Sequence, residues 1–260
     1  GGKKERYDAV VLATGGASYT PTGSTGDGYA FAKAFGHSVT PIVPSLISLE
    51  TEEEWPKELM GLSLKNVTLN AYNKKKKLVY SELGEMLFTH FGVSGPLVLS
   101  ASSRIADDPA GARLTIDLKP GLDADELDRR LVRDFQQNSR KSFQNALDGL
   151  FPRRMIPVMV QLSGIAADTE TNSVTREQRH AFAALIKCVP ITVKAAMPID
   201  QAIITRGGIN VKEIDPSTME SKLVSGLYFA GEVIDVDAYT GGFNIQIACS
   251  TGVLAGRSII

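Results

Sequence analysis

Residues 226–246 read GLYFAGEVIDVDAYTGGFNIQ. The apolar run at residues 227–230 is typical of a buried strand, and Gly231-Glu232 follows it directly. Gly241-Gly242-Phe243-Asn244 then leads into an Ala/Gly/Ser-rich stretch that predicts a helix over residues 245–260. Glycine lets the main chain approach a ligand closely, and the N–H groups that open a helix attract negative charge. The stretch therefore predicts a strand, a glycine turn and a helix, as in nucleotide-binding α/β sheets.

Two more glycine clusters stand next to apolar runs elsewhere in the chain. Thr14-Gly15-Gly16 follows the run at residues 7–12, and Arg206-Gly207-Gly208 follows the run at residues 202–205. A single Gly-Gly pair indicates no more than a tight turn. Three clusters placed after strand-like runs predict instead that backbone N–H groups from both ends of the chain form one side of a nucleotide site.

The middle of the chain has a different character. Residues 46–120 contain short alternating apolar runs separated by turn residues, which predicts a β-rich module. Residues 121–195 are mainly helical in pattern, because apolar residues such as Leu127 and Leu131 recur at helical spacing. We therefore expect a fold of mixed α/β and α+β type. Residues 1–45 and 196–260 would form a partial Rossmann-like domain, interrupted by an insertion at residues 46–195.

The composition is that of a soluble cytoplasmic protein. The chain has 28 Lys and Arg against 29 Asp and Glu, so its net charge of -1 predicts neither a nucleic acid nor a membrane surface as partner. The basic run at residues 74–77 is interpreted as a solvated hairpin tip. Cys188 and Cys249 have no metal-ligand spacing around them, so we expect two buried, inert thiols and no metal site.

Three segments resemble motifs of one bacterial flavoprotein family, the BaiN-like NAD(P)/FAD-dependent oxidoreductases, which also contains aminoacetone oxidases. They are residues 226–246, Thr205-Arg-Gly-Gly-Ile209 with Thr218-Met-Glu-Ser-Lys222, and Gly84-Glu-Met-Leu-Phe-Thr-His-Phe-Gly-Val-Ser-Gly-Pro96. More distantly, residues 13–16 and 24–28 resemble fumarate-reductase and aspartate-oxidase flavoproteins. The resemblance covers almost the whole chain. It implies an FAD-dependent oxidoreductase that holds a small organic substrate between the FAD domain and the insert domain, with NAD(P)H as a candidate electron donor.

The resemblance also implies cofactor-binding roles for the glycine clusters. Residues 14–16 would shape the turn beside the cofactor, and residues 206–208 would lie against the flavin. Glu232 would hold ribityl or ribose hydroxyls, and residues 241–244 would face the pyrimidine edge of the flavin. The implied cofactor residues are Thr14, Gly15, Gly16, Arg206, Gly207, Gly208, Gly231, Glu232, Gly241, Gly242, Phe243 and Asn244.

One feature of that family is absent from the sequence. Family members begin with a strand, a G-x-G-x-x-G turn and a helix, and an acidic residue about 20 positions later binds the ribose. These 260 residues contain no such fingerprint. We therefore expect a truncated chain that lacks the adenosine and pyrophosphate side of the site, with FAD binding weakened or lost. The alternative hypothesis is a catalytically inactive fragment with a structural or interaction role.

Four polar residues complete the sequence-based expectations. His90 lies inside one of the resembling motifs, and two roles stay open for it: an acid or base beside the flavin N5, or a structural ring satisfied by backbone groups. His37 and His180 are interpreted as surface residues. Asp27 is expected to cap the helix predicted over residues 28–35, with substrate contact as the alternative.

Overall fold

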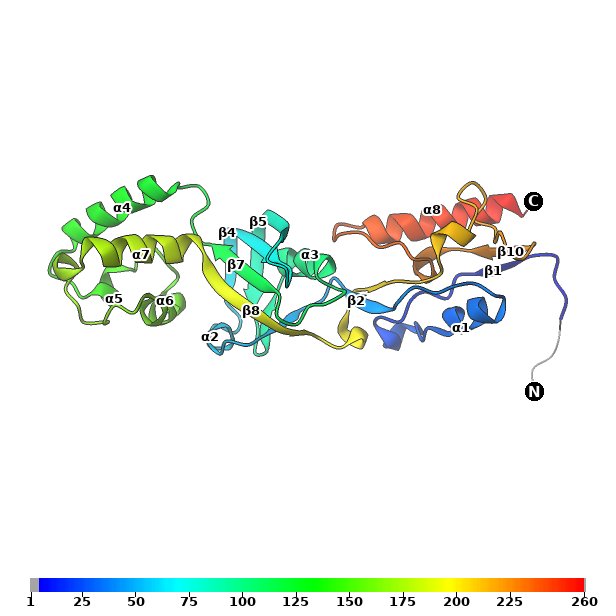
Figure 1. Cartoon of the computed structure of the whole chain (residues 1–260), viewed down its shortest axis with the longest axis horizontal. Coiled ribbons are helices and arrows are strands. Elements are labelled where there is room, and N and C mark those ends of the chain that lie inside the picture. Colours follow the sequence, from blue (N-terminus) through cyan, green and yellow to red (C-terminus); the bar gives the residue numbers. More distant parts are fainter. Residues whose placement is uncertain (1–4, 260) are drawn as a thin grey trace. The chain divides into compact units, whose positions relative to one another are not determined.

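The computed structural model describes residues 5–259, which form two compact units (Figure 1). The first unit contains the described residues up to Ser48, the segment Ser102–Asp107 and the residues from Ala196 onward. The second unit contains Leu49–Ala101 and Asp108–Ala195. The chain therefore enters the first unit three times, and segments far apart in the sequence pack together there. The expectation of a mixed α/β and α+β fold is confirmed.

The first unit is built on two small sheets. β1 (Val10–Leu12) pairs in parallel with β10 (Leu227–Phe229), and β2 (Val43–Ser45) pairs antiparallel with β9 (Ile204–Arg206). Its helices are α1 (Asp27–Ala34) and α8 (Phe243–Ser258), with short 3-10 turns at Thr20–Thr22, Ile199–Gln201, Val211–Glu213 and Gly231–Val233. Its core includes Leu12, Ala32, Ile209, Phe229 and Val233.

A closed barrel of six strands dominates the second unit. Neighbouring strands follow the order β3-β6-β5-β4-β7-β8 around the barrel. Those strands are β3 (Leu49–Thr51), β4 (Ser63–Tyr72), β5 (Leu78–Phe88), β6 (Gly92–Ser94), β7 (Arg113–Asp117) and β8 (Val189–Ala196). Closure removes the free edges on which strands of other chains could pair. Two helices occur between barrel strands in the sequence, α2 (Trp55–Glu58) before β4 and α3 (Pro96–Arg104) after β6. The last residues of α3 belong to the first unit.

The rest of the second unit is helical. Its helices are α4 (Ala124–Gln137), α5 (Phe143–Ala146), α6 (Ile156–Ser163) and α7 (Arg176–Lys187), with 3-10 turns at Arg153–Met155 and Thr171–Ser173. The ring of Phe143 meets the rings of Phe135 and Phe182 edge-on, with centroids 6.0 and 5.1 Å apart. Edge-to-face pairs of this kind add to the burial free energy of the rings. They hold α4, α5 and α7 together.

Strands and helices are not fully separated along residues 46–195. The region predicted to be mainly helical ends with β8, whose residues 189–192 pair with β7. An apolar run that is buried in a barrel cannot be distinguished by its pattern from a buried helix segment, because the partner strand is about 75 residues away in the chain. The basic run at residues 74–77 lies between β4 and β5, so its interpretation as a hairpin tip is confirmed.

Several expectations about individual residues were wrong. Both cysteines, Cys188 and Cys249, are exposed. Cys188 ends α7, and Cys249 lies on α8, whose only buried side chain is Ala255. Asp27 does not cap α1, because the N-cap residue is Gly26 and no side chain accepts a hydrogen bond there. Asp27 lies instead in the first turn, where its charge favours the helix dipole.

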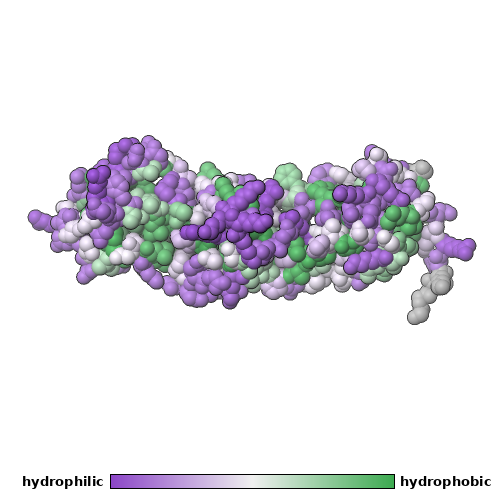
Figure 2. Space-filling model, in the orientation of Figure 1, coloured by the Kyte–Doolittle hydropathy of each residue, from purple (hydrophilic) through white to green (hydrophobic). Residues whose placement is uncertain are grey.

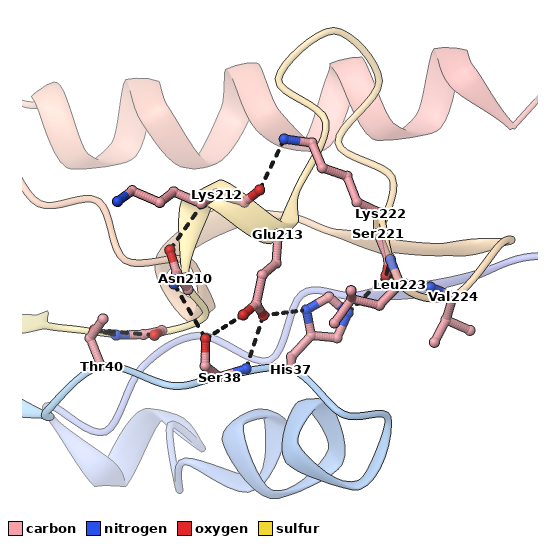
Figure 3. A network of polar contacts seen from close by, with 11 residues as sticks. His37, Ser38, Thr40, Asn210, Lys212, Glu213, Ser221, Lys222, Leu223 and Val224 are labelled. Carbon is pink, nitrogen blue, oxygen red and sulfur yellow. Dashed lines mark hydrogen bonds and ion pairs between the residues drawn. The ribbon is translucent and has the colours of Figure 1, made fainter.

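His37 was expected at the surface and is in fact 3% exposed (Figure 3). Its Nδ1 lies 3.1 Å from Oε2 of Glu213, and its Nε2 lies 2.8 Å from Oγ of Ser221. That hydroxyl also accepts hydrogen bonds from the backbone N–H groups of Leu223 and Val224. The position after a helix stop suggested exposure, but long-range partners more than 170 residues away bury the ring and satisfy both its nitrogens. His180 is exposed, as expected.

No helix within residues 5–259 is long and apolar enough to cross a bilayer. Hydrophilic and hydrophobic residues are interspersed on the face drawn in Figure 2.

Candidate functional site

The carboxyl ends of β1 and β10 bring two of the three glycine clusters together. Because the two strands are parallel and in register, the residues that follow them leave the sheet at the same edge. Thr14–Gly16 follows β1, and Gly231-Glu232 follows β10. A Cβ atom added to Gly16 would lie 3.0 Å from Oε1 of Glu232. The two clusters are therefore in direct contact, although 215 residues separate them in the sequence.

Thr205 in β9 joins the third glycine cluster to the first. Its Oγ1 accepts hydrogen bonds from the backbone N–H groups of Ala17 and Ser18, at 2.8 and 2.9 Å. A Cβ atom on Gly16 would lie only 2.4 Å from this oxygen, so no larger residue fits there without displacing Thr205. Gly16 is thus required by close packing within the protein.

Glu232, which follows β10, contacts both β9 and the loop after β1. Its Oε1 accepts a hydrogen bond from the backbone N–H of Thr205 at 2.5 Å and another from the hydroxyl of Ser18 at 3.3 Å. The hydroxyl of Tyr29 is buried nearby without a hydrogen-bond partner among the described residues. Burial, with Glu232 and Asp235 adding their negative charges, raises the pKa of Tyr29 to about 12. An unpaired buried hydroxyl beside a carboxylate is a polar group that a hydroxyl-bearing ligand could satisfy.

Gly207 and Gly208 have a different reason to be glycines. A Cβ atom on Gly207 would lie 2.0 Å from the carbonyl oxygen of Pro41, and one on Gly208 would lie 2.6 Å from that of Val233. The N–H of Gly208 donates to Oγ1 of Thr40 at 2.9 Å, and its carbonyl accepts from the N–H of Thr40. Backbone packing accounts for both glycines, and the N–H of Gly208 is already used within the protein.

The N-terminus of α8 is the most open part of the three clusters. Gly242 is the N-cap residue with φ +90°, and no side chain caps the helix. Nothing lies within 4 Å of the place where a Cβ atom on Gly242 would be. Asn244 faces inward: its side chain accepts from the N–H of Ala238 and donates to the carbonyl of the same residue, both at 2.8 Å. The first N–H groups of a 16-residue helix are thus presented at an open surface whose preceding loop is held in place.

A cavity of about 450 Å³ adjoins this helix end within the first unit. Its size is typical of a small-molecule site. It brings together Arg206 and Phe243, two of the expected cofactor residues. The lining residues are Ser103, Arg104, Arg206, Asp237, Ala238, Tyr239 and Phe243. A smaller cavity of about 130 Å³ is lined in part by Glu232 and Asn244, so the residue after β10 and the first turn of α8 share one recess.

Within the larger cavity, Arg206 is largely occupied. It donates a hydrogen bond of 2.6 Å to the carbonyl of Ser103 and lies 3.4 Å from the carboxylate of Asp107. Asp237 accepts from the hydroxyl of Ser45 at 3.0 Å. The contacts of Arg206 attach the short segment 102–107 to β9, and the contact of Asp237 attaches the loop before α8 to β2. The sequence could not reveal that this segment belongs here, because it lies inside the region that pattern assigned to the insertion.

His90 lies apart from these clusters in the chain and belongs to the second unit. It is exposed in the turn between β5 and β6, and its ring meets the ring of Phe91 edge-on at 4.9 Å. No group of three or more His, Cys, Asp or Glu side chains in residues 5–259 could hold a metal ion.

Comparison with known proteins places the chain in a family. The model of the family described as "HI0933-like protein barrel and H2TH domain" matches residues 43–204. This range contains the whole six-stranded barrel and the helices α4 to α7.

Three curated relatives match nearly the whole chain. It is 30% identical over 260 residues to the 3-dehydro-bile acid delta(4,6)-reductase of Clostridium scindens, covering 99% of the chain and 63% of the relative. It is 32% identical over 252 residues to the ribosomal RNA dihydrouridine synthase of Haemophilus influenzae, covering 96% of the chain and 60% of the relative. The protein of the same description from Escherichia coli is 30% identical over 253 residues, covering 97% and 61%. The chain thus spans about three fifths of the length of the curated relatives it matches.

Proposed function

The chain belongs to the HI0933-like protein family, and from this premise we propose that it is part of an FAD-dependent oxidoreductase that reduces a carbon–carbon double bond conjugated to a carbonyl group. In this proposal the unit that contains β1, β10 and α8 is part of a Rossmann-like FAD-binding domain, and the barrel unit is inserted into it. The observation that carries the proposal is the meeting of three glycine clusters, from both ends of the chain, beside an open helix N-terminus and a cavity.

The relatives support this reaction type through their names. A reductase of a delta(4,6) 3-dehydro-bile acid acts on double bonds conjugated to a ketone, and a dihydrouridine synthase saturates a ring double bond conjugated to a carbonyl. The two substrates differ greatly in size and shape, but the reacting groups are of the same class. This shared chemistry favours an oxidoreductase over a purely structural chain.

The residues present fit a flavin at the N-terminus of α8. The space beside Gly242 is open, and no side chain competes for the first N–H groups of the helix. Such N–H groups and the helix dipole stabilise negative charge, as on the pyrimidine edge of a reduced flavin. When bound, FAD would supply the hydride for the reduction. Asn244 would hold the loop before the helix, and Arg206 would fix the segment 102–107 at the side of the cavity.

The internal hydrogen bonds refine the roles expected for Glu232 and Gly208. One oxygen of Glu232 organises the loop after β1, which leaves the other for ligand hydroxyls. Gly208 would act by allowing close backbone packing and not by donating its N–H. NAD(P)H as electron donor, a small organic substrate and the absence of nucleic-acid partners stay predictions.

The visible spectrum of the purified protein tests the proposal. After incubation with an excess of FAD and removal of the free cofactor, we expect the absorption band of oxidised flavin, and FAD in the supernatant after heat denaturation. Gly242→Ala should lower the FAD content, because an L-residue at φ +90° is strained and its Cβ enters the open space. Gly252→Ala, in the same helix and also without neighbours, is the matched control. A protein that stays colourless when FAD is added would refute the proposal.

Substrate class is tested by a second experiment. Under anaerobic conditions the reduced protein should be reoxidised by a conjugated ketone and not by its saturated counterpart. A uridine-containing RNA and a 3-oxo steroid acid with a delta-4 double bond distinguish the two kinds of acceptor known among the relatives. If neither conjugated compound nor a simple cyclic enone reoxidises the reduced protein, the proposed reaction is refuted.

A further inference from the structure

Arg104 and Tyr239 face the larger cavity as a pair. Arg104 is the last residue of α3, and Tyr239 precedes Gly241-Gly242 at the start of α8. Nε of Arg104 donates a hydrogen bond to the hydroxyl oxygen of Tyr239. The guanidinium carbon also lies 4.7 Å from the centre of the Tyr239 ring, within the range of a cation–π contact. The two side chains therefore fix each other by two kinds of contact, though 135 residues separate them.

The pair leaves several donors unused. The Tyr239 oxygen accepts from Arg104, and within residues 5–259 its own O–H has no acceptor. The two terminal nitrogens of Arg104 likewise have no acceptor among the described residues. Arg206, the other arginine of the cavity, already donates to Ser103 and contacts Asp107. Among the charged and phenolic groups that line the cavity, Arg104 and Tyr239 thus retain free donors.

The backbone around the pair is held independently of any ligand. The side-chain amide of Asn244 bonds the N–H and carbonyl of Ala238 and contacts the carbonyl of Tyr239 at 3.4 Å. Two arginines against one aspartate, Asp237, give the cavity lining a net positive charge. Preorganised donors in a positive recess are what an oxygen that gains negative charge requires.

We propose that Arg104 and Tyr239 form a receptor for the carbonyl oxygen of the substrate and stabilise it as an enolate oxygen. This inference rests on the proposed function for the reaction itself. FAD, when bound and reduced, would supply a hydride to the β-carbon. The electrons of the double bond would move to the carbonyl oxygen, and protonation of the α-carbon by water would restore the ketone. The double bond would thus gain two electrons and two protons overall, as one hydride from the flavin and one proton from water, with the flavin as the reductant. The O–H of Tyr239 and an N–H of Arg104 donate to the oxygen while it carries the charge.

A binding experiment tests the receptor without turnover. The probe is 4-nitrophenolate, a planar anion whose oxygen is conjugated as in an enolate, and 4-nitroanisole is the uncharged probe of similar shape. Calorimetric titration of the purified protein should show that the phenolate binds and that the anisole binds at least about tenfold more weakly, as expected for the loss of charge-assisted hydrogen bonds.

Variants assign the binding to the pair. Tyr239→Phe and Arg104→Met should each weaken phenolate binding about tenfold or more and leave anisole binding unchanged. Arg104→Lys keeps the charge but not the paired geometry, and should give an intermediate dissociation constant. Tyr7→Phe and Arg140→Met, at exposed positions outside the cavity, are the matched controls. Circular dichroism of each variant establishes that it is folded.

The outcomes separate this inference from the proposed function. Phenolate that fails to bind, or that binds equally well to the wild type and to both variants, overturns the receptor even if the protein contains FAD. If phenolate binding depends on Arg104 and Tyr239 but the protein never binds FAD, the anion receptor is supported and the proposed reductase function is refuted. Loss of binding in the two control variants would also overturn the assignment to the pair.

Discussion

Thr205 is the residue whose replacement most directly tests how the candidate site is assembled. It is 1% exposed, and its Oγ1 accepts two hydrogen bonds from the loop after β1, at 2.8 Å from Ala17 and 2.9 Å from Ser18. Thr205→Val keeps the shape of the side chain and removes the acceptor. Both N–H groups then lose their partner inside the protein.

The magnitude follows from the burial of the two donors. Ser18 is 4% exposed, so its N–H bears most of the desolvation cost, about 1–3 kcal/mol. Ala17 is only partly buried, so its N–H regains water and costs about 1 kcal/mol. We expect Thr205→Val to lower the free energy of unfolding of the first unit by about 2–4 kcal/mol. Thr205→Ser, which keeps the oxygen and loses one methyl group, should cost about 1 kcal/mol.

The assay combines urea unfolding with amide hydrogen exchange. The single tryptophan, Trp55, lies in the second unit, so its fluorescence reports that unit separately from the circular dichroism of the whole chain. Exchange of the amides at Ala17 and Ser18 should accelerate in Thr205→Val and stay slow in Thr205→Ser. If the two variants are equally stable and exchange at these amides is unchanged, Thr205 does not hold the loop after β1 in place.

Three further predictions follow from other contacts. Gly252→Ala should stabilise the protein by about 0.5–1 kcal/mol in urea unfolding, because the residue lies exposed within α8 and its Cβ would meet nothing within 4 Å; a loss of stability would mean that another surface packs there. Hydrogen bonds from Ser38, and from His37, hold the pKa of Glu213 below its usual value. The stabilisation of the fold by the Glu213 carboxylate is therefore present above its unfolded pKa of about 4.3 and is lost as the pH falls through the lower folded pKa. The free energy of unfolding of Glu213→Gln should therefore fall less than that of the wild type when the pH is lowered through this range. Cys188 and Cys249 should both react with a thiol reagent in the native protein, and a count of one or none before denaturation would contradict their exposure.

The sequence by itself determined the elements on either side of the glycine clusters. Apolar runs before Thr14 and Gly231 predicted β1 and β10, and the Gly241-Gly242 turn predicted the start of α8 within two residues. These features are local, since chain stiffness, positive φ and apolar burial act over a few residues. The motifs also indicated the family correctly.

Only the tertiary structure decided which groups stand beside those clusters. It placed the segment 102–107 in the first unit and buried His37 against Glu213. It also made the end of the region predicted to be helical into β8, a strand of the barrel. Arg104 and Tyr239 carry no local signal, because each is an ordinary residue at the end of a helix or in a loop. Their meeting depends on contacts between residues more than 100 positions apart, which hydrophobic burial and hydrogen bonding select only when the whole chain folds.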